Sequence, residues 1–322
     1  MRPYRWLLWV IAAASVVFAV RFATRFPWDT TLAALQQADW LLLVGAGIAS
    51  LLSVCAKGWA WHLLLKPAWP HRWRDAQAAT LVGAAVSTVS VSVSGEAARL
   101  QTLAARSDPP IGTVVSSVVW SRITETIGLA VFLGACFALL PPGPGVQAVR
   151  IATAVVLLAI ALLWITGAWR WLIVRLPARW QHVAGIGSVT GTPPLVAPVA
   201  LGVVNWGLQW LAYHASIIGV GIVAPPGAAL AALVAANLGG ILRLTPGNVG
   251  VLQASIVMGL LPFGVPADQA LAAGLALQAA QIVPTILAGI ALAGRAALRP
   301  RAAFRTTVAG SAGDSGTDGS AG

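Results

Sequence analysis

The sequence predicts an all-α, polytopic membrane protein, and three observations predict that class. Hydrophobic residues make up 58% of the 322-residue chain, only 9% of its residues are charged, and the mean hydropathy is +0.83. A single soluble core cannot bury so large an apolar fraction. Several apolar runs approach the roughly 20 helical residues that cross a hydrocarbon layer of about 30 Å. No segment alternates polar and apolar residues with the period of a strand, so the spans are predicted to be helices.

We expect about six full transmembrane helices, two re-entrant helical hairpins and a tail. The full spans are predicted at residues 5–22, 39–65, 111–140, 146–166, 195–223 and 267–293. Together with the hairpins they form a single membrane domain over residues 1–305. Residues 306–322 are rich in Gly, Ala, Ser and Thr, a composition that predicts a disordered cytoplasmic tail.

Two segments break their apolar runs with glycine-rich bends and predict the hairpins. They are residues 76–107, which bend near Gly95, and residues 228–262, which bend at 244–248. Irregular backbone at membrane depth is tolerated only where it is buried in protein or lines a cavity. The bends resemble each other: Ser94-Gly95-Glu96 and Gln101 align with Pro246-Gly247-Asn248 and Gln253. Because three predicted spans separate them, this is either an inverted repeat or a chance match.

Arginine supplies nearly all of the net charge of +11 and sets the expected orientation. Basic residues gather at the N-terminus and in residues 66–75, 169–182 and 295–305, whereas the turns at 141–145 and 225–227 carry none. The positive-inside rule therefore places both termini in the cytoplasm. Attraction of anionic lipid headgroups is a compatible second explanation of the charge. Nucleic-acid binding is not expected, because no soluble basic domain is present.

Glu96 and Glu125 are the only two glutamates in the chain, and both lie in stretches predicted to be within the membrane. Each has an arginine three residues away, Arg99 and Arg122 respectively, and such pairs share one helix face. An ionised side chain at bilayer depth costs about 2.5–3.5 kcal/mol on insertion scales, so it usually faces protein or trapped water. These four residues are therefore candidates for handling a polar ligand.

A further candidate cluster surrounds the second bend. It comprises Arg243, Thr245, Pro246, Gly247, Asn248, Gly250 and Gln253, with Gln278 and Gln281 in the last span. Thr245 and Pro246 suit the start of a helix, whose free N–H groups favour an anion. Arg243 would add a bidentate phosphate donor. The alternative is that the glutamines only hydrogen-bond helices together.

The remaining polar residues are less informative. Lys57 is interpreted as a side chain near a helix end that snorkels to the interface. Asn205, Gln209 and Tyr213 recur at helical spacing and predict either a polar seam or a packing face. We find no metal-ligand spacing, phosphate loop or nucleophile motif, so neither a metal, a cofactor nor an enzymatic activity is expected.

Three runs resemble the lysylphosphatidylglycerol synthase transmembrane region, a family also described as flippase-like. They are Ser94-Gly95-Glu96-Ala97-Ala98-Arg99, Ser121-Arg122-Ile123-Thr124-Glu125 and Thr245-Pro246-Gly247-Asn248-Val249-Gly250 with Gln253. The similarity covers about residues 5–295. It implies a multi-pass protein of the bacterial inner membrane that moves a lipid or lipid-linked headgroup between leaflets.

The resemblance also assigns residues. Glu96 and Arg99 match the family's Gly-Glu-x-x-Arg element and Arg122 its arginine, whereas Glu125 stands where aspartate is usual. Gly247 and Gly250 match a Pro-Gly-x-x-Gly bend. Two departures are the glutamines Gln253 and Gln278, which occupy places where glutamate and arginine are frequent. Losing both partners leaves the net charge unchanged but puts in doubt a transport step that needs this ion pair.

The expected function is therefore translocation of an anionic phospholipid or a polyprenyl-linked lipid, with Arg122 and Arg243 holding the phosphate. Two alternatives remain open: a non-catalytic membrane partner of a lipid-dependent glycosyltransferase or lipid synthase, and a small-solute transporter. The soluble aminoacyl-transferase domain of two-domain synthases is missing from these 322 residues, so lipid aminoacylation by them alone is not expected.

Overall fold

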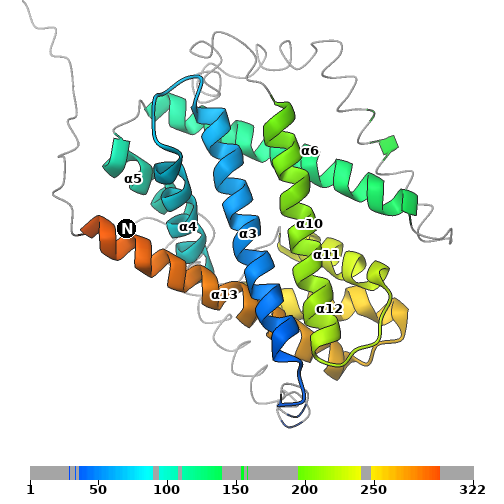
Figure 1. The fold of residues 1–322 in the computed structure, drawn as a ribbon. Coiled ribbons are helices and arrows are strands. Elements are labelled where there is room, and N and C mark those ends of the chain that lie inside the picture. The colour runs from blue at the N-terminus through cyan, green and yellow to red at the C-terminus, as the bar shows by residue number, and fades with distance from the viewer. Residues whose placement is uncertain are drawn as a thin grey trace, which may run out of the picture.

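The computed structural model describes residues 36–89, 94–107, 111–139, 195–240 and 248–297, together with a few isolated positions. Every regular element in these residues is helical (Figure 1), which confirms the all-α prediction. The elements are α3 (Trp40–Leu65), α4 (Trp73–Val89), α5 (Ser94–Ser107), α6 (Ile111–Leu139), α10 (Val196–Gly219), α11 (Pro226–Gly240), α12 (Val251–Leu260), the 3-10 turn η2 (Leu261–Phe263) and α13 (Ala267–Ala297).

Three of these helices are long and apolar enough to cross a membrane. They are α3, the Ser116–Cys136 part of α6 and the Ala267–Leu292 part of α13, which correspond to three of the predicted spans. At 24 residues α10 has sufficient length, but Asn205, Gln209 and His214 lower its hydropathy and it is not among the three. The predicted spans at 5–22 and 146–166 and the predicted tail lie outside the described stretches.

Two pairs of short helices occupy the segments predicted as hairpins. Helix α4 packs against α5, and α11 packs against α12. At the first crossing, a Cβ atom added to Gly83 would lie 2.8 Å from the carbonyl oxygen of Gly95 and 2.8 Å from Cβ of Arg99. The absence of a side chain there lets the two helices touch. Re-entrant insertion of these pairs and the inverted repeat stay predictions.

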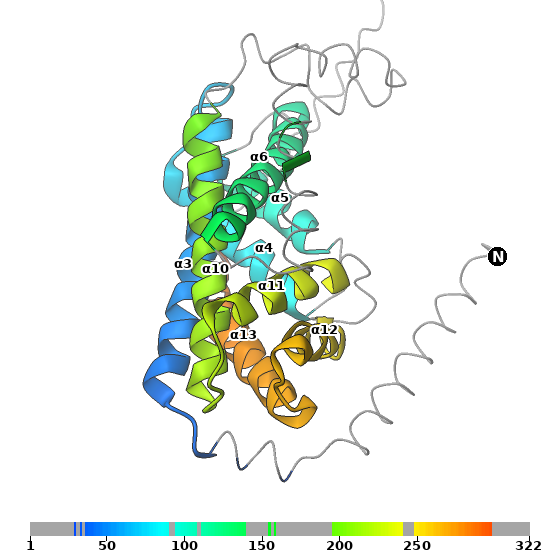
Figure 2. The same ribbon diagram turned by 90° about the vertical axis from the view of Figure 1, so that its right-hand side faces the viewer.

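The helices form two layers around a core of small residues. Helices α3 and α10 run side by side on one face, and the other helices lie behind them (Figure 2). Alanines dominate the largest buried cluster, among them Ala46, Ala212, Ala228, Ala232 and Ala270. Small residues let helix backbones approach closely, which is the usual packing mode in membranes. Large apolar side chains such as Leu41 and Ile290 instead project outward, as lipid-facing positions require.

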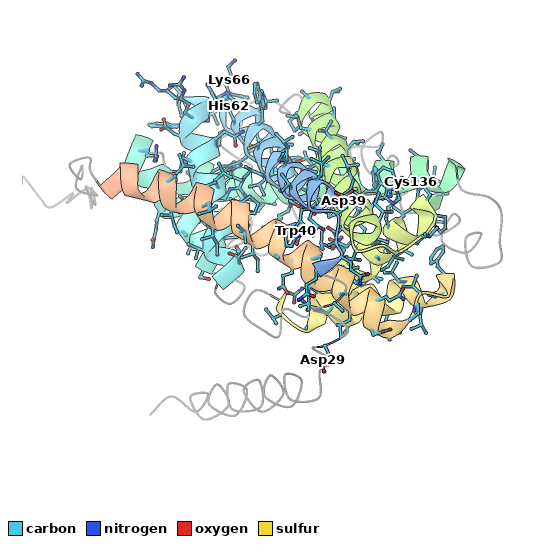
Figure 3. The ribbon with its side chains drawn as sticks, turned by 60° about the horizontal axis from the view of Figure 1, so that its bottom comes forward. Asp29, Asp39, Trp40, His62, Lys66 and Cys136 are labelled. Carbon is cyan, nitrogen blue, oxygen red and sulfur yellow. The ribbon has the colours of Figure 1, made fainter. Side chains whose placement is uncertain are left out.

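The two ends of α3 differ chemically. At its first turn the Asp39 carboxylate accepts hydrogen bonds from the N–H groups of Leu41 and Leu42 at 2.9 and 3.3 Å, an N-cap. The Asp39 N–H donates to the carbonyl oxygen of Gly219 at 2.7 Å, so the start of α3 and the end of α10 lie together. His62 and Lys66 lie toward the opposite end of α3 (Figure 3).

Candidate functional site

A cavity of about 560 Å³ lies at the centre of the described helices. Each of the eight α-helices contributes at least one residue to its wall. Charged side chains come from α3, α5 and α6, and amide and hydroxyl side chains come chiefly from α10, α11 and α13. The structure therefore gathers polar groups from distant parts of the sequence into one internal space.

The charged wall is a chain of ion pairs across three helices. Arg122 of α6 pairs with Glu96 of α5 and, at 3.2 Å, with Glu125 on its own helix. Arg99 lies 3.6 Å from the other Glu96 oxygen, and Lys57 of α3 lies 4.0 Å from Glu125. The structure thus brings together all four ionisable residues singled out in the first two motifs. Three cations face two carboxylates, which leaves one positive charge uncompensated among the described residues.

Lys57 is a correction to the sequence analysis. It was interpreted as snorkelling near a helix end, but α3 continues to Leu65, about two helical turns further on. The ammonium group therefore lines the cavity, 4.0 Å from Glu125 and 5.8 Å from the centre of the Trp206 ring. Its distance from the true helix end was the missing signal.

Arg99 is held in an unusual way for a buried cation. Its guanidinium carbon lies 3.8 Å from the centre of the Trp61 ring, and only 6% of the residue is exposed. Trp61 is itself fixed, because its indole N–H donates to Ser117 Oγ at 2.9 Å. Nε and Nη2 of Arg99 have no hydrogen-bond partner among the described residues. Stacking thus positions Arg99 while two nitrogens keep their donors open.

The glutamines meet across helices, as the interhelical hydrogen-bond alternative predicted. Gln253 of α12 donates to Gln278 of α13 and accepts from the N–H of Gly250 at 2.7 Å. Gln253 is fully buried and does not line the cavity, whereas Gln278 does. Gln253 therefore supports the start of α12, and Gln278 connects that support to the cavity wall.

A second amide pair links α13, α10 and α3. Gln281 donates to Gln209 at 3.3 Å, and Gln209 donates to Ser53 Oγ at 2.7 Å. Gln209 and Tyr213 line the cavity, which supports the polar-seam alternative for these two residues. Asn205 does not line it; its side chain is fully buried, with neither amide atom hydrogen-bonded among the described residues.

The second bend is described only from its last residues. Asn248 lines the cavity with a left-handed backbone at φ 58°, and its Oδ1 has no hydrogen-bond partner in the described part. Gly250 precedes α12 at φ 83°, a conformation that favours glycine. Arg243, Thr245, Pro246 and Gly247 lie outside the described residues. Within the described stretches, no group of three His, Cys, Asp or Glu side chains is placed to hold a metal ion.

These features define a membrane domain, built of helices, with a charged internal cavity. The chain belongs to the lysylphosphatidylglycerol synthase transmembrane-region family, whose model matches residues 6–289. This match confirms the resemblance carried by the three short runs and extends it over all the described helices except the last residues of α13. No curated protein matches the chain.

Proposed function

We propose that this domain binds the phosphate of an anionic lipid headgroup in the central cavity and moves the headgroup between the leaflets of the bacterial inner membrane. The observation that carries the proposal is the uncompensated positive charge of Lys57, Arg99 and Arg122, with open donors on Arg99. Buried arginines with free donors favour phosphate, because the planar guanidinium matches its oxygens.

The cavity volume is consistent with a headgroup rather than a whole lipid. A space of about 560 Å³ falls within the range of roughly 300–1,000 Å³ typical of small-ligand sites. The acyl chains would then stay outside, against the exposed apolar faces of the helices. Glu96 and Glu125 would hold Arg122 until the phosphate arrives, since an unpaired arginine in a dry site is costly.

Proteoliposomes that contain the purified chain and headgroup-labelled lipids test this function. We expect Arg122→Gln to abolish movement of an anionic lipid, because it removes the cation shared by both carboxylates. Arg72→Gln is the matched control, since Arg72 is exposed between α3 and α4, outside the central cavity. Equal movement by Arg122→Gln and the unchanged chain would contradict the proposal.

Transport of a small organic anion is the second candidate, because the same volume and charge would accept one. Uptake of a labelled phosphate ester into these proteoliposomes, without lipid movement, would favour it. If the folded protein moved neither, the proposal would give way to the role of a membrane partner for a glycosyltransferase or lipid synthase.

A further inference from the structure

The two walls of the cavity offer different chemistry. Described cavity residues from α10 to α13 include no Asp, Glu, Lys, Arg or His. That wall instead carries amide and hydroxyl groups, which belong to Gln209, Tyr213, Asn237, Gln278, Gln281 and Thr285. An amide both donates and accepts hydrogen bonds, as does each hydroxyl group of a polyol or a sugar. The neutral wall is therefore chemically complementary to a hydroxylated, uncharged group.

Several of these groups are held ready for a ligand. Gln209 is oriented at both amide atoms, by Ser53 and by Gln281, so its rotamer is fixed before binding. On the opposite side, Ser50 lines the cavity, is only 2% exposed and has an Oγ without a hydrogen-bond partner among the described residues. Asn248 Oδ1 has the same property. A buried polar atom without a partner is costly, which points to a ligand that satisfies it.

The same cavity is poorly suited to an amine. An ammonium group needs a free carboxylate or an aromatic face, but Glu96 and Glu125 are already paired with cations. The Trp206 ring is already approached by Lys57. A cationic headgroup would also meet the excess positive charge of the other wall.

We propose that the ligand is a phosphate ester with an uncharged, hydroxylated headgroup, such as a glycerol or a sugar, and that amine-bearing headgroups are rejected. This inference rests on the proposed function and names the substrate class of the same cavity. The phosphate binds at Arg99 and Arg122, and the hydroxyl groups bind the amide wall of α10, α11 and α13.

Calorimetric binding to the full chain in detergent micelles tests the substrate class with four probes. The lipid probes are short-chain phosphatidylglycerol and phosphatidylethanolamine, and the free esters are glycerol 3-phosphate and methyl phosphate. We expect each hydroxylated probe to bind at least about tenfold more tightly than its counterpart, because a site built for hydroxyl groups rejects ligands that lack them. The comparison of lipid with free ester shows whether the natural source is a membrane lipid.

Two variants locate the discrimination. Gln281→Leu and Asn237→Leu remove amides from the neutral wall, and Asn237 donates only to the carbonyl of Leu233 in its own helix, so the second change should leave packing intact. Both should reduce affinity for the hydroxylated probes and leave methyl phosphate unchanged. Gln101→Leu, at an exposed position on α5, is the matched control.

The outcomes separate this inference from the function on which it rests. Equal or tighter binding of phosphatidylethanolamine, or variants that weaken all probes alike, would overturn the headgroup class while the phosphate site stands. Failure of all four probes to bind the folded protein would overturn both.

Discussion

At the scale of single residues, the site depends on how Arg99 is positioned rather than on charge alone. Its stacking on Trp61 and its open Nε and Nη2 atoms are properties of a planar guanidinium. Lysine keeps the charge but presents a compact ammonium that cannot stack and donate in the same way.

Arg99→Lys should therefore weaken binding of a phosphate ester about tenfold, equivalent to about 1.4 kcal/mol. Lys57→Arg is the comparison, since it exchanges the same two residue types at the edge of the ion-pair chain, and we expect a smaller change. Titration calorimetry with glycerol 3-phosphate measures both. Unchanged affinity in Arg99→Lys would mean that only its charge matters.

Residue-level sequence reasoning identified the charges but not their partners. The spacing of Glu96 with Arg99 and of Arg122 with Glu125 predicts two pairs within helices, and the structure confirms both. The contact between Arg122 and Glu96 depends on the placement of α5 beside α6, which short-range spacing does not contain.

At the scale of helices, close crossings position the carboxylates. Helices α6 and α10 meet where a Cβ atom added to Gly128 would lie 2.7 Å from the carbonyl carbon of Gly202. Glu125 is on the same stretch of α6, and its carbonyl oxygen accepts a hydrogen bond from the Trp206 indole at 3.0 Å. Separation of the two helices would therefore move Glu125 away from Lys57.

Gly128→Ala should lower the thermal unfolding midpoint and weaken ligand binding, because the added methyl group overlaps backbone that cannot yield. Gly45→Ala is the matched control: an added Cβ there has nothing within 4 Å, and alanine favours a helix by about 1 kcal/mol over glycine. Thermal unfolding in detergent compares the two. A Gly128→Ala protein as stable as Gly45→Ala would contradict the crossing.

The contact between Gln253 and Gln278 is a second connection between helices. Gln253→Glu would bury a carboxylate without a cation beside it, which costs about 3–5 kcal/mol when a buried charge lacks its partner. Adding Gln278→Arg supplies the cation at the position that already touches Gln253.

We therefore expect Gln253→Glu to lower the unfolding midpoint and the double variant to recover most of the loss. Thermal unfolding of the two single variants and the double variant measures the coupling. Additive losses in the double variant would show that the two side chains do not interact in the membrane-embedded protein.

At the scale of the whole molecule, the sequence predicted the class and the site's chemistry better than the number of spans. Composition is sufficient for an all-helical membrane protein, and three described helices meet the length and apolarity of a span. Helix α10 shows why counting is harder: Asn205, Gln209 and Tyr213 lower its hydropathy yet turn into the protein. Hydropathy averages over both faces of a helix and so penalises one that lines a cavity.

The packing also constrains topology. The start of α3 lies beside the end of α10, so the link between α10 and α11 should face the side opposite to the basic link between α3 and α4. With both native cysteines changed to alanine, Arg72→Cys should react with an impermeant thiol reagent only from the cytoplasm. Val223→Cys, at a fully exposed position, should react only from outside. Labelling of both from one side would contradict this arrangement.

The most direct measurement is an experimental structure of the chain in nanodiscs that contain phosphatidylglycerol. We predict density for a phosphate inside the cavity, within hydrogen-bond distance of Arg99 and Arg122, with the glycerol directed toward Gln209 and Gln281. A cavity that holds only water, with ordered phosphates confined to the outer surface, would contradict headgroup binding at this site.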